Sequence, residues 1–227
     1  HARSTHQADE REVYVMVVGE TSRACNWALY GYERETNPGL SGIGGLTAFS
    51  HVLTESNTTH KSVPMLLSPV SASSFDSIYY QKGIITAFKE AGYQTAFFSN
   101  QRYNHSFIDF FGKEADTYDF IKEDVGDSNY NPSDNELLKL VAKELGKGVS
   151  RQFIVLHTYG SHFNYKERYP AEQAFFLPDM PVDAEVKYKD NLINAYDNSI
   201  RYTDNFLVRL IAVSYTHLRA HETLSDL

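Results

Sequence analysis

Carboxylate, hydroxyl and imidazole side chains in this sequence stand where metal or nucleophile chemistry could take place. Glu20 follows an apolar run, and a carboxylate at the end of a strand is a hard ligand for a divalent metal. Thr58, Thr59 and Ser62 lie in a polar segment before a helix, where a metal can lower the pKa of a hydroxyl and make it a nucleophile. His157 ends another apolar run and His162 follows it, so either imidazole could bind a metal or phosphate or act as an acid.

Each of these residue types also has an ordinary structural use. A carboxylate after a strand more often caps a helix or forms a loop salt bridge. Hydroxyls such as those of Thr58, Thr59 and Ser62 commonly cap helices, and a single histidine is more often a structural hydrogen-bonding residue. The residues alone therefore indicate only a hydroxyl–carboxylate–imidazole site, with the structural alternatives open.

The surrounding pattern predicts the elements that must position these side chains. Continuous apolar runs are typical of strands buried on both faces of a parallel sheet, and residues 13–18, 95–99 and 153–157 have this character. Apolar residues at helical spacing predict helices over 84–91, 137–145 and 188–211, a helix opening near Val63, and a capping box of Ser133 with Glu136. Strands that alternate with helices predict an α/β fold with a mostly parallel sheet. The carboxyl ends of such strands gather at one edge.

Composition limits the class of protein. The chain has 227 residues, of which 42% are hydrophobic, enough for one sizeable α/β domain and too apolar for a disordered tail. The formal net charge of −8 gives little electrostatic support for a nucleic-acid partner. Cys25 is the one cysteine, which excludes an internal disulfide and a CxxC zinc site. Any metal must therefore be held by carboxylate, hydroxyl or imidazole groups.

The two ends of the chain differ from its middle. Residues 1–11 are polar and predict a linker, and residues 12–212 carry the α/β pattern. Residues 213–223 match the in-frame translation of a transposase-type sequencing-library adapter, so we expect 213–227 not to be native; the alternative is a natural basic helix end. His217 and His221 are then not metal ligands despite their spacing, and we expect the native protein to continue past Ala212.

Four ordered segments resemble one known family. Residues 17–27, with Gly31-Tyr32 and residues 36–38, resemble the opening of the catalytic domain of lipid A phosphoethanolamine transferases. That family includes the mobile colistin-resistance enzymes and belongs to the alkaline phosphatase/sulfatase superfamily. Residues 59–64 resemble its nucleophile segment, 153–162 its strand ending in His-x-x-Gly-Asn-His (with Ser161 for the asparagine), and 192–198 a family helix. The resemblance implies a three-layer α/β domain with a mostly parallel central sheet, truncated at its C-terminus.

The resemblance also implies a reaction and its residues. Glu20 and Thr59 match ligands of a catalytic zinc ion (Zn²⁺), and Thr59 matches the nucleophile that takes phosphoethanolamine from phosphatidylethanolamine. A lipid A phosphate then accepts the group. His162 and Asn57 match substrate-binding positions, His162 near the phosphoethanolamine group or a second zinc. The family's remaining ligands, an Asp-His pair in an Asp-His-Gly segment, are expected downstream of Ala212, so we expect the fragment itself to be inactive.

The same resemblance implies a location. Family members carry N-terminal membrane helices, which would precede His1, anchor the protein in the inner membrane and leave the catalytic domain in the periplasm. Polymyxin resistance is a possible consequence of lipid A modification by such an enzyme. Departures from the family leave the acceptor phosphate open: Asn57 stands where some relatives have threonine, and residues 100–106 differ from the substrate loop of the best-known members.

Two other functions compete with this one. A phosphoglycerol transferase also uses a threonine nucleophile, and other hydrolases of the superfamily share the scaffold. A sulfatase needs an arginine where this chain has Leu66, which argues against sulfate ester hydrolysis. A non-catalytic scaffold is the alternative of a different class, and the joint presence of Glu20, Thr59 and His162 argues against it.

Overall fold

Four parallel strands form the centre of the fold. The computed structural model describes residues 11–123 and 129–225. Within these residues the sheet has the order β1–β4–β2–β3, and all its pairs are parallel, so the predicted α/β class with a mostly parallel sheet is confirmed. His157 at the end of β4 lies opposite Val18 of β1 and Ser99 of β2, so these strands end at the same edge. The strands are β1 (Glu12–Val18), β2 (Gln94–Ser99), β3 (Thr117–Phe120) and β4 (Arg151–His157).

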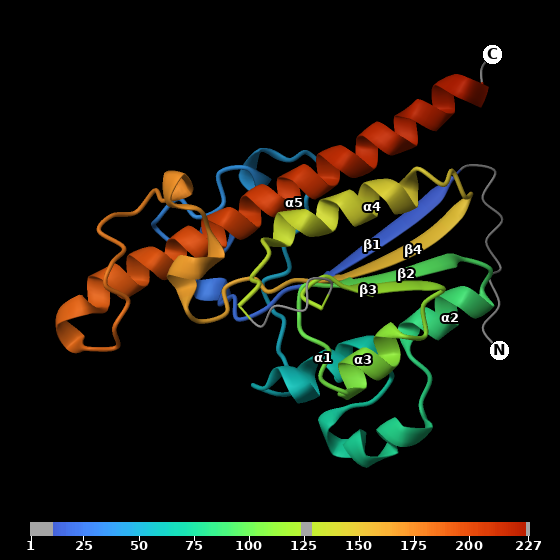
Figure 1. Cartoon of the computed structure of the whole chain (residues 1–227), viewed down its shortest axis with the longest axis horizontal. Helices are drawn as coiled ribbons and strands as arrows, with labels where there is room; N and C mark the ends of the chain where they lie inside the picture. The colour runs from blue at the N-terminus through green and yellow to red at the C-terminus, as the bar shows by residue number, and fades with distance from the viewer. Residues whose placement is uncertain (1–10, 124–128, 226–227) are drawn as a thin grey trace.

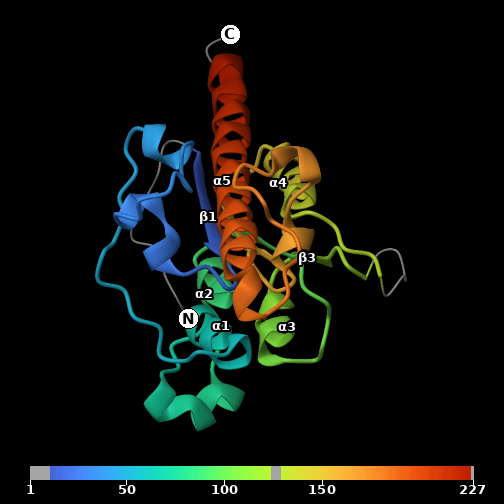
Figure 2. The same ribbon diagram turned by 90° about the vertical axis from the view of Figure 1, so that its left-hand side faces the viewer.

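Helices cover both faces of the sheet and make three layers (Figure 1). On one face lie α1 (Thr59–Leu67), α2 (Ile84–Glu90) and α3 (Phe107–Gly112); on the other lie α4 (Leu137–Leu145) and α5 (Lys189–Ser225). Figure 2 shows the same separation after a quarter turn. The three-layer arrangement follows from burial on both sides of a parallel sheet, because each face must be covered by helices.

Side chains of β4 alternate between two hydrophobic cores, one on each face of the sheet. Phe153 and Val155 pack with the buried residues of α1, α2 and α3, whereas Ile154 and Leu156 pack with those of α4 and α5. Successive side chains of a strand point to opposite faces, so a continuous apolar run is what a central strand needs. Such a run is the pattern from which this strand was predicted.

Short 3₁₀ helices occur in the connections. They are η1 (Ala24–Asn26), η2 (Ala28–Tyr30), η3 (Leu40–Gly42), η4 (Ala72–Tyr80), η5 (Asp134–Glu136), η6 (Tyr165–Arg168), η7 (Ala171–Gln173) and η8 (Val186–Tyr188). The first three lie in the connection between β1 and α1, residues 19–58, and this connection carries several of the candidate site residues.

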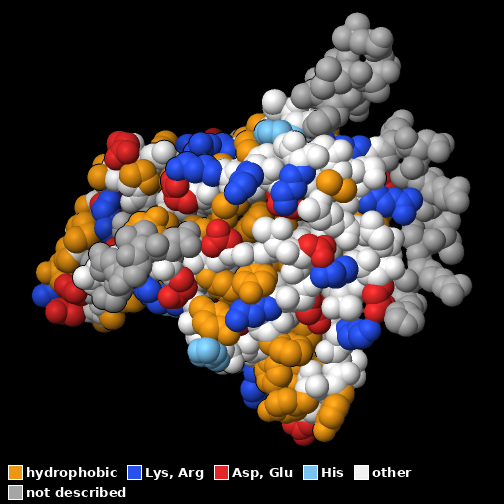
Figure 3. All heavy atoms as spheres, turned by 45° about the vertical axis from the view of Figure 1, so that its right-hand side comes forward, with side chains coloured by type: hydrophobic (Ala, Val, Ile, Leu, Met, Phe, Trp, Pro, Cys, Tyr) orange, Lys and Arg blue, Asp and Glu red, His pale blue; other side chains and the backbone are white. Residues whose placement is uncertain are grey.

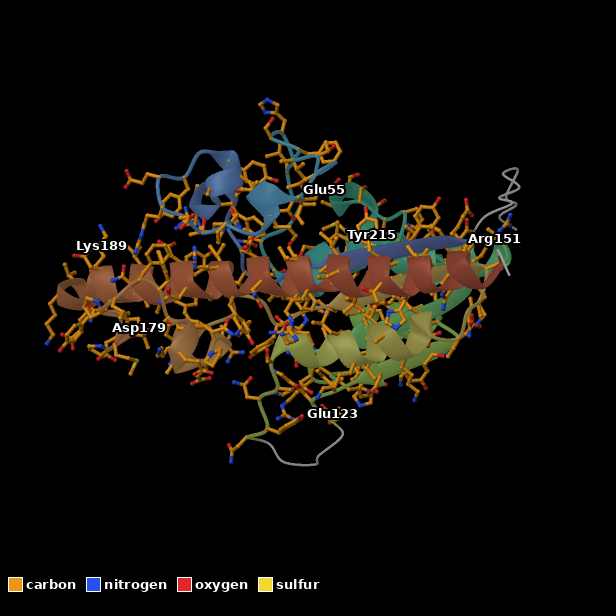
Figure 4. All side chains as sticks on the ribbon, turned by 90° about the horizontal axis from the view of Figure 1, so that it is seen from above. Glu55, Glu123, Arg151, Asp179, Lys189 and Tyr215 are labelled. Carbon is orange, nitrogen blue, oxygen red and sulfur yellow. The ribbon has the colours of Figure 1, made fainter. Side chains whose placement is uncertain are left out.

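The long helix α5 holds that connection in place. In Figure 4, α5 runs from Lys189 along the molecule past Tyr215, and the segment with Glu55 lies to one side of it. Two buried carboxylates of α5 accept hydrogen bonds from the connection: Asp197 from Asn26, Tyr32 and Arg34, and Asp204 from the backbone N–H groups of Gly39 and Leu40. Burial raises the pKa of Asp204, and its two backbone hydrogen bonds offset part of that effect.

Some element boundaries differ from the sequence predictions. The helix expected to open near Val63 begins four residues earlier, so Thr59 is its first residue and not part of a loop. Ser133 caps η5 by accepting a hydrogen bond from the Asn135 N–H, while the Glu136 side chain pairs with Lys139 instead of completing a capping box. The short elements α3 and β3 were not predicted.

The expected domain boundaries are only partly visible. Residues 1–10 of the expected linker lie outside the described residues, and Arg11, its last residue, donates hydrogen bonds to the carbonyls of Leu145 and Val149. At the other end α5 continues through residues 213–225, and 226–227 lie outside the described residues. The boundary at residue 212 therefore stays a prediction.

Apolar side chains also reach the surface. Figure 3 shows hydrophobic side chains gathered at the lower end of the molecule, the end where η4 lies; Tyr79 and Tyr80 of η4 are 72% and 88% exposed. In the part of the chain that the structure describes, no helix combines the length and apolar character that a bilayer span requires.

Candidate active site

A carboxylate and a hydroxyl meet at the carboxyl edge of the sheet. Glu20 stands two residues beyond β1, and Thr59 begins α1. The Thr59 Oγ1 lies 3.0 Å from Glu20 Oε1 and 3.1 Å from Oε2, so its hydroxyl donates to the carboxylate. The two residues are 39 positions apart in sequence, and the Glu20 side chain is only 10% exposed. The structure therefore brings together the two residues that the resemblance implied as metal ligands.

The loop after β4 holds the Glu20 backbone. Thr158 N–H donates to the Val18 carbonyl and Ser161 N–H donates to the Glu20 carbonyl, each at 3.0 Å. Between them Gly160 has a φ of +52°, and a Cβ there would lie 2.6 Å from the Glu20 carbonyl oxygen. Glycine is required at this position on both counts, since it tolerates the left-handed backbone and allows the close approach. The backbone of Glu20 is thereby fixed to the strand that ends at His157.

A strained turn follows Glu20. Thr21 has a φ of +52°, which is unfavourable for a β-branched residue. The hydroxyl of Tyr196 on α5 donates to the Thr21 carbonyl and accepts from the Arg23 N–H, both at 2.8 Å. Burial raises the pKa of Tyr196 to about 12, so the phenol keeps the proton that it donates. Tyr196 therefore closes the turn from α5.

His157 lies beside this carboxylate, in the interior. Its side chain is fully buried, and its Nε2 is 3.9 Å from Glu20 Oε2. Within the described residues neither ring nitrogen has a hydrogen-bond partner. Burial lowers the pKa of His157 to about 4, so the imidazole is neutral near pH 7 and forms no ion pair with Glu20.

A cleft of about 680 Å³ opens over Glu20 and Thr59. Its polar wall comes from the connection between β1 and α1, and its apolar wall from α1, α5 and η6. Asn57, one of the predicted substrate-binding residues, is exposed and lines the cleft. The lining residues are 19–23, Asn26, Thr54, 56–59, Ser62, Val63, Leu66, Tyr165, Leu192, Ile193 and Tyr196.

His162, the other predicted substrate-binding residue, does not line this cleft. Its ring stacks on Tyr159 at 4.8 Å between centroids, and its Nδ1 lies 2.8 Å from the Phe163 carbonyl. The side chain is exposed although its neighbour Ser161 bonds to Glu20. His162 is thus adjacent in sequence to a residue that contacts Glu20, but its imidazole stacks on Tyr159.

The oxygen donors of Glu20 and Thr59 fit a zinc ion as two of its four ligands. A carboxylate and a hydroxyl in mutual contact form a donor pair of the kind that zinc accepts, and a tetrahedral site needs two more. Among the described residues no group of three or more His, Cys, Asp or Glu side chains could hold a metal together. A zinc ion held by this pair would therefore need further ligands.

Comparison with known proteins identifies the family. The family model described as Sulfatase matches residues 12–213, nearly the whole folded part of the chain. The chain belongs to the sulfatase family. Its relatives within that family include Mcr-1 of Escherichia coli, a phosphatidylethanolamine transferase, which is 31% identical over an alignment covering 98% of this chain and 44% of the relative.

Two further relatives are also phosphoethanolamine transferases. The Kdo(2)-lipid A phosphoethanolamine 7''-transferase of Escherichia coli K12 is 30% identical over 91% of this chain and 38% of its own length. The C-terminal periplasmic domain of Escherichia coli EptC, solved in complex with Zn, superposes with a TM-score of 0.81 and 26% identity, covering 91% of this chain and 60% of that one. This sulfatase-family chain is thus homologous to phosphoethanolamine transferases, and it spans less than half the length of the two curated relatives.

Among the cleft residues to which the sequence assigned no role are Tyr196 and Arg23. The sequence places Tyr196 on the apolar side of a helix and in the resembling segment 192–198, but its hydroxyl contacts depend on where α5 lies relative to residues 21–23. Arg23 was noticed only as part of the resembling segment. A cation three residues after a candidate ligand carboxylate was the available signal for it.

Proposed function

We propose that this chain is the catalytic domain of a phosphoethanolamine transferase that moves phosphoethanolamine from phosphatidylethanolamine to a phosphate of lipid A or a related glycolipid. The observation that supports this most is the contact between Thr59 and Glu20 at the start of α1, inside a cleft. The homology to transferases of this group supplies the substrate class.

In the first half-reaction Thr59 Oγ attacks the phosphorus of the donor. The new bond joins Thr59 Oγ to phosphorus, the bond from phosphorus to the glycerol oxygen breaks, and diacylglycerol leaves as an alcohol after taking a proton. Glu20 accepts the hydrogen bond of the Thr59 hydroxyl and orients its lone pairs. Thr59 is the first residue of α1, where helix N–H groups without partners favour the phosphoryl oxygens.

In the second half-reaction an oxygen of the acceptor phosphate attacks the same phosphorus. The bond to Thr59 Oγ breaks, and Thr59 takes up a proton from the acceptor phosphate, which replaces the one that left with diacylglycerol. The product joins phosphoethanolamine to the glycolipid phosphate, and the enzyme returns to its starting state. A covalent phosphothreonine-type intermediate therefore separates the two substrates in time, which gives ping-pong kinetics.

Glu20 and Thr59 are the residues that would hold zinc in this chain. When bound there, zinc supplies a Lewis acid that favours ionised Thr59 and neutralises phosphoryl oxygens. We propose that an Asp-His pair elsewhere in the complete protein provides the other two ligands. Because two ligands do not complete a tetrahedral site, the 227-residue chain alone should not turn over.

The proposed donor and acceptor are membrane lipids, so the cleft must work at a membrane. We propose that the complete protein is anchored in the inner membrane by N-terminal helices and that this domain faces the periplasm. The support is the resemblance noted above and the homologous domain of EptC, which is periplasmic. Modification of lipid A by this domain would mask negative charge and so favour polymyxin resistance.

The test is Thr59→Ala in the complete protein. We expect loss of diacylglycerol release from fluorescent phosphatidylethanolamine by roughly 10³-fold or more, because the attacking oxygen is removed. The matched control is Thr58→Ala, which removes a neighbouring hydroxyl that lines the same cleft. An active Thr59→Ala variant would show that the nucleophile lies elsewhere.

The choice of donor separates this function from its nearest alternative. Phosphatidylglycerol offered in place of phosphatidylethanolamine should not be consumed. Release of diacylglycerol from phosphatidylglycerol alone would reassign the domain to phosphoglycerol transfer.

A further inference from the structure

The charged groups of the cleft are few. Of the described residues that line it, Arg23 is the one Lys or Arg and Glu20 the one Asp or Glu. Arg23 is exposed, and within the described part of the chain its guanidinium has neither an ion pair nor a hydrogen bond; its backbone N–H donates to Tyr196 and its carbonyl accepts from the Asn26 N–H. Arg23 thus lines the cleft, and a guanidinium without a protein partner is available to a ligand.

The backbone of Arg23 is held firmly. The Tyr196 hydroxyl bonds to both Thr21 and Arg23, so it fixes the turn that runs from Glu20 to the guanidinium-bearing residue. The cation and the carboxylate therefore belong to one rigid segment, anchored on one side to the loop after β4 and on the other to α5. A substrate that contacts Arg23 is placed relative to Glu20 and Thr59.

The proposed reaction needs a cation for its second substrate. A phosphate monoester carries about −1.5 to −2 charge near pH 7. In the second half-reaction it must approach a phosphodiester on Thr59 and the Glu20 carboxylate, in a chain whose net charge is −8. An arginine fork pairs with two phosphate oxygens at once and is the side chain suited to this task.

We infer that Arg23 binds the phosphate of the acceptor and positions it for attack on the phosphorus at Thr59. The inference rests on the proposed function, and it identifies a residue that binds the acceptor in the same cleft. The donor's phosphorus must lie at Thr59, whereas Arg23 is exposed and meets the substrate that arrives second.

The experiment compares the two half-reactions in the complete protein. Diacylglycerol released in the absence of acceptor measures the first, and phosphoethanolamine transferred to lipid A measures both. For Arg23→Gln we expect the KM for lipid A to rise roughly 10- to 100-fold, the range for loss of a charge-assisted hydrogen-bonded pair. The first half-reaction should stay within about twofold, and Arg23→Lys should recover part of the loss because it keeps the charge without the fork.

Arg209→Gln is the matched control. Arg209 is exposed on α5 and outside the cleft, so this variant removes the same charge from the molecule and should leave both half-reactions unchanged. Equal slowing of diacylglycerol release in Arg23→Gln would assign the guanidinium to the donor phosphate and overturn the inference. Unchanged kinetics in both half-reactions would overturn it as well. A wild-type protein that releases no diacylglycerol would instead defeat the proposed function, and the inference with it.

Discussion

At the scale of single residues, the site depends on Glu20, whose backbone and carboxylate are both held by hydrogen bonds. The Glu20 carbonyl accepts a hydrogen bond from the loop after β4, and its carboxylate accepts hydrogen bonds from the hydroxyls of Thr21 and Thr59. The side chain is therefore oriented before any substrate enters. Preorganised ligands of this kind favour metal binding, because little order has to be gained on association.

Glu20→Gln tests that role with a change of charge and almost none of shape. We expect the complete protein to bind zinc at least about tenfold more weakly, since the anionic ligand is lost, while thermal unfolding changes little. Zinc content after dialysis against a calibrated chelator is the measurement. Glu33→Gln, at an exposed glutamate outside the cleft, is the control. Full transfer activity after exhaustive metal removal would contradict a zinc enzyme.

Lys122 is a second residue with an unusual environment. It is 5% exposed, and its Nζ lies 3.1 Å from the centroid of the Tyr159 ring. Burial, helped by the nearby Arg168, lowers the pKa of Lys122 to about 8 from an ordinary 10.5. Between these values the unfolded chain binds the proton and the folded chain does not, so the free energy of unfolding must rise with pH in this window.

We expect this contribution to raise stability by about 2 kcal/mol between pH 7.5 and pH 9.5. Lys122→Met should remove it and also stabilise the protein at pH 7, because a buried charge is no longer desolvated. Urea unfolding at the two pH values measures both effects. Lys143→Met, at an exposed lysine on α4, should leave the pH dependence as it is in the wild type. A Lys122→Met variant that keeps the full pH dependence would place its origin elsewhere.

The candidate residues differ in how far sequence could locate them. Residue type and position indicate Glu20, the resemblance selects Thr59 among the nearby hydroxyls, and the structure puts the two in contact; their roles remain predictions. Asn57 lines the same cleft, whereas His162 faces Tyr159. The direction of a side chain after a strand depends on loop geometry and on contacts from distant elements, which spacing does not encode.

At the scale of elements, α5 organises the connection that carries the site. Asp197 is fully buried and accepts hydrogen bonds from three side chains of that connection, including Arg34 at 2.6 Å. Removing one partner of a buried pair leaves the other uncompensated. Residues 26–34 of the connection are therefore held by a carboxylate of a helix more than 150 residues later in the chain.

Asp197→Ala should lower the free energy of unfolding by about 2–4 kcal/mol for this reason. Urea unfolding at pH 7 measures the change. Asp190→Ala removes an exposed carboxylate near the start of the same helix and should change stability by less than about 0.5 kcal/mol. Equal changes in the free energy of unfolding would mean that the hydrogen bonds of Asp197 contribute no more to stability than an exposed carboxylate of the same helix.

The longer elements were predictable and the shorter ones were not. The strands at 12–18, 94–99 and 151–157 and the helices at 84–90 and 137–145 were predicted within two residues at each end, because each has a clear apolar pattern. β3 has four residues, with two polar positions among them, and depends on pairing with β2. α3 has six residues, too few to show a helical period.

At the scale of the whole molecule, the fold class and the family agree with the sequence predictions. Parallel strands, helices on both faces and the match over residues 12–213 all indicate one sulfatase-like domain. The course of residues 19–58 was not predictable, because it is set by contacts with α5 and not by its own periodicity. Hydrogen bonds between polar side chains far apart in the sequence determine the course of this segment, and a single sequence does not reveal which residues pair.

The predicted boundary at residue 212 can be tested on the whole chain. From Ile211 to Leu218 no side chain is buried, although Val213 packs partly against the core between the sheet and α4 and α5. Removal of residues 213–227 should therefore lower the Tm by no more than about 3 °C, the effect of about 1 kcal/mol in a protein of this size. Thermal unfolding of the two lengths by circular dichroism is the measurement. A much larger loss would show that these residues belong to the folded domain.

The exposed thiol of Cys25 has a practical use that follows from its position. It is the one cysteine of the chain and lies between Arg23 and Asn26, both of which line the cleft. A maleimide fluorophore or a nitroxide would therefore attach at a single point beside the cleft, without any prior removal of other thiols. Occupancy of the cleft by each lipid could then be followed by a spectroscopic signal, independently of turnover.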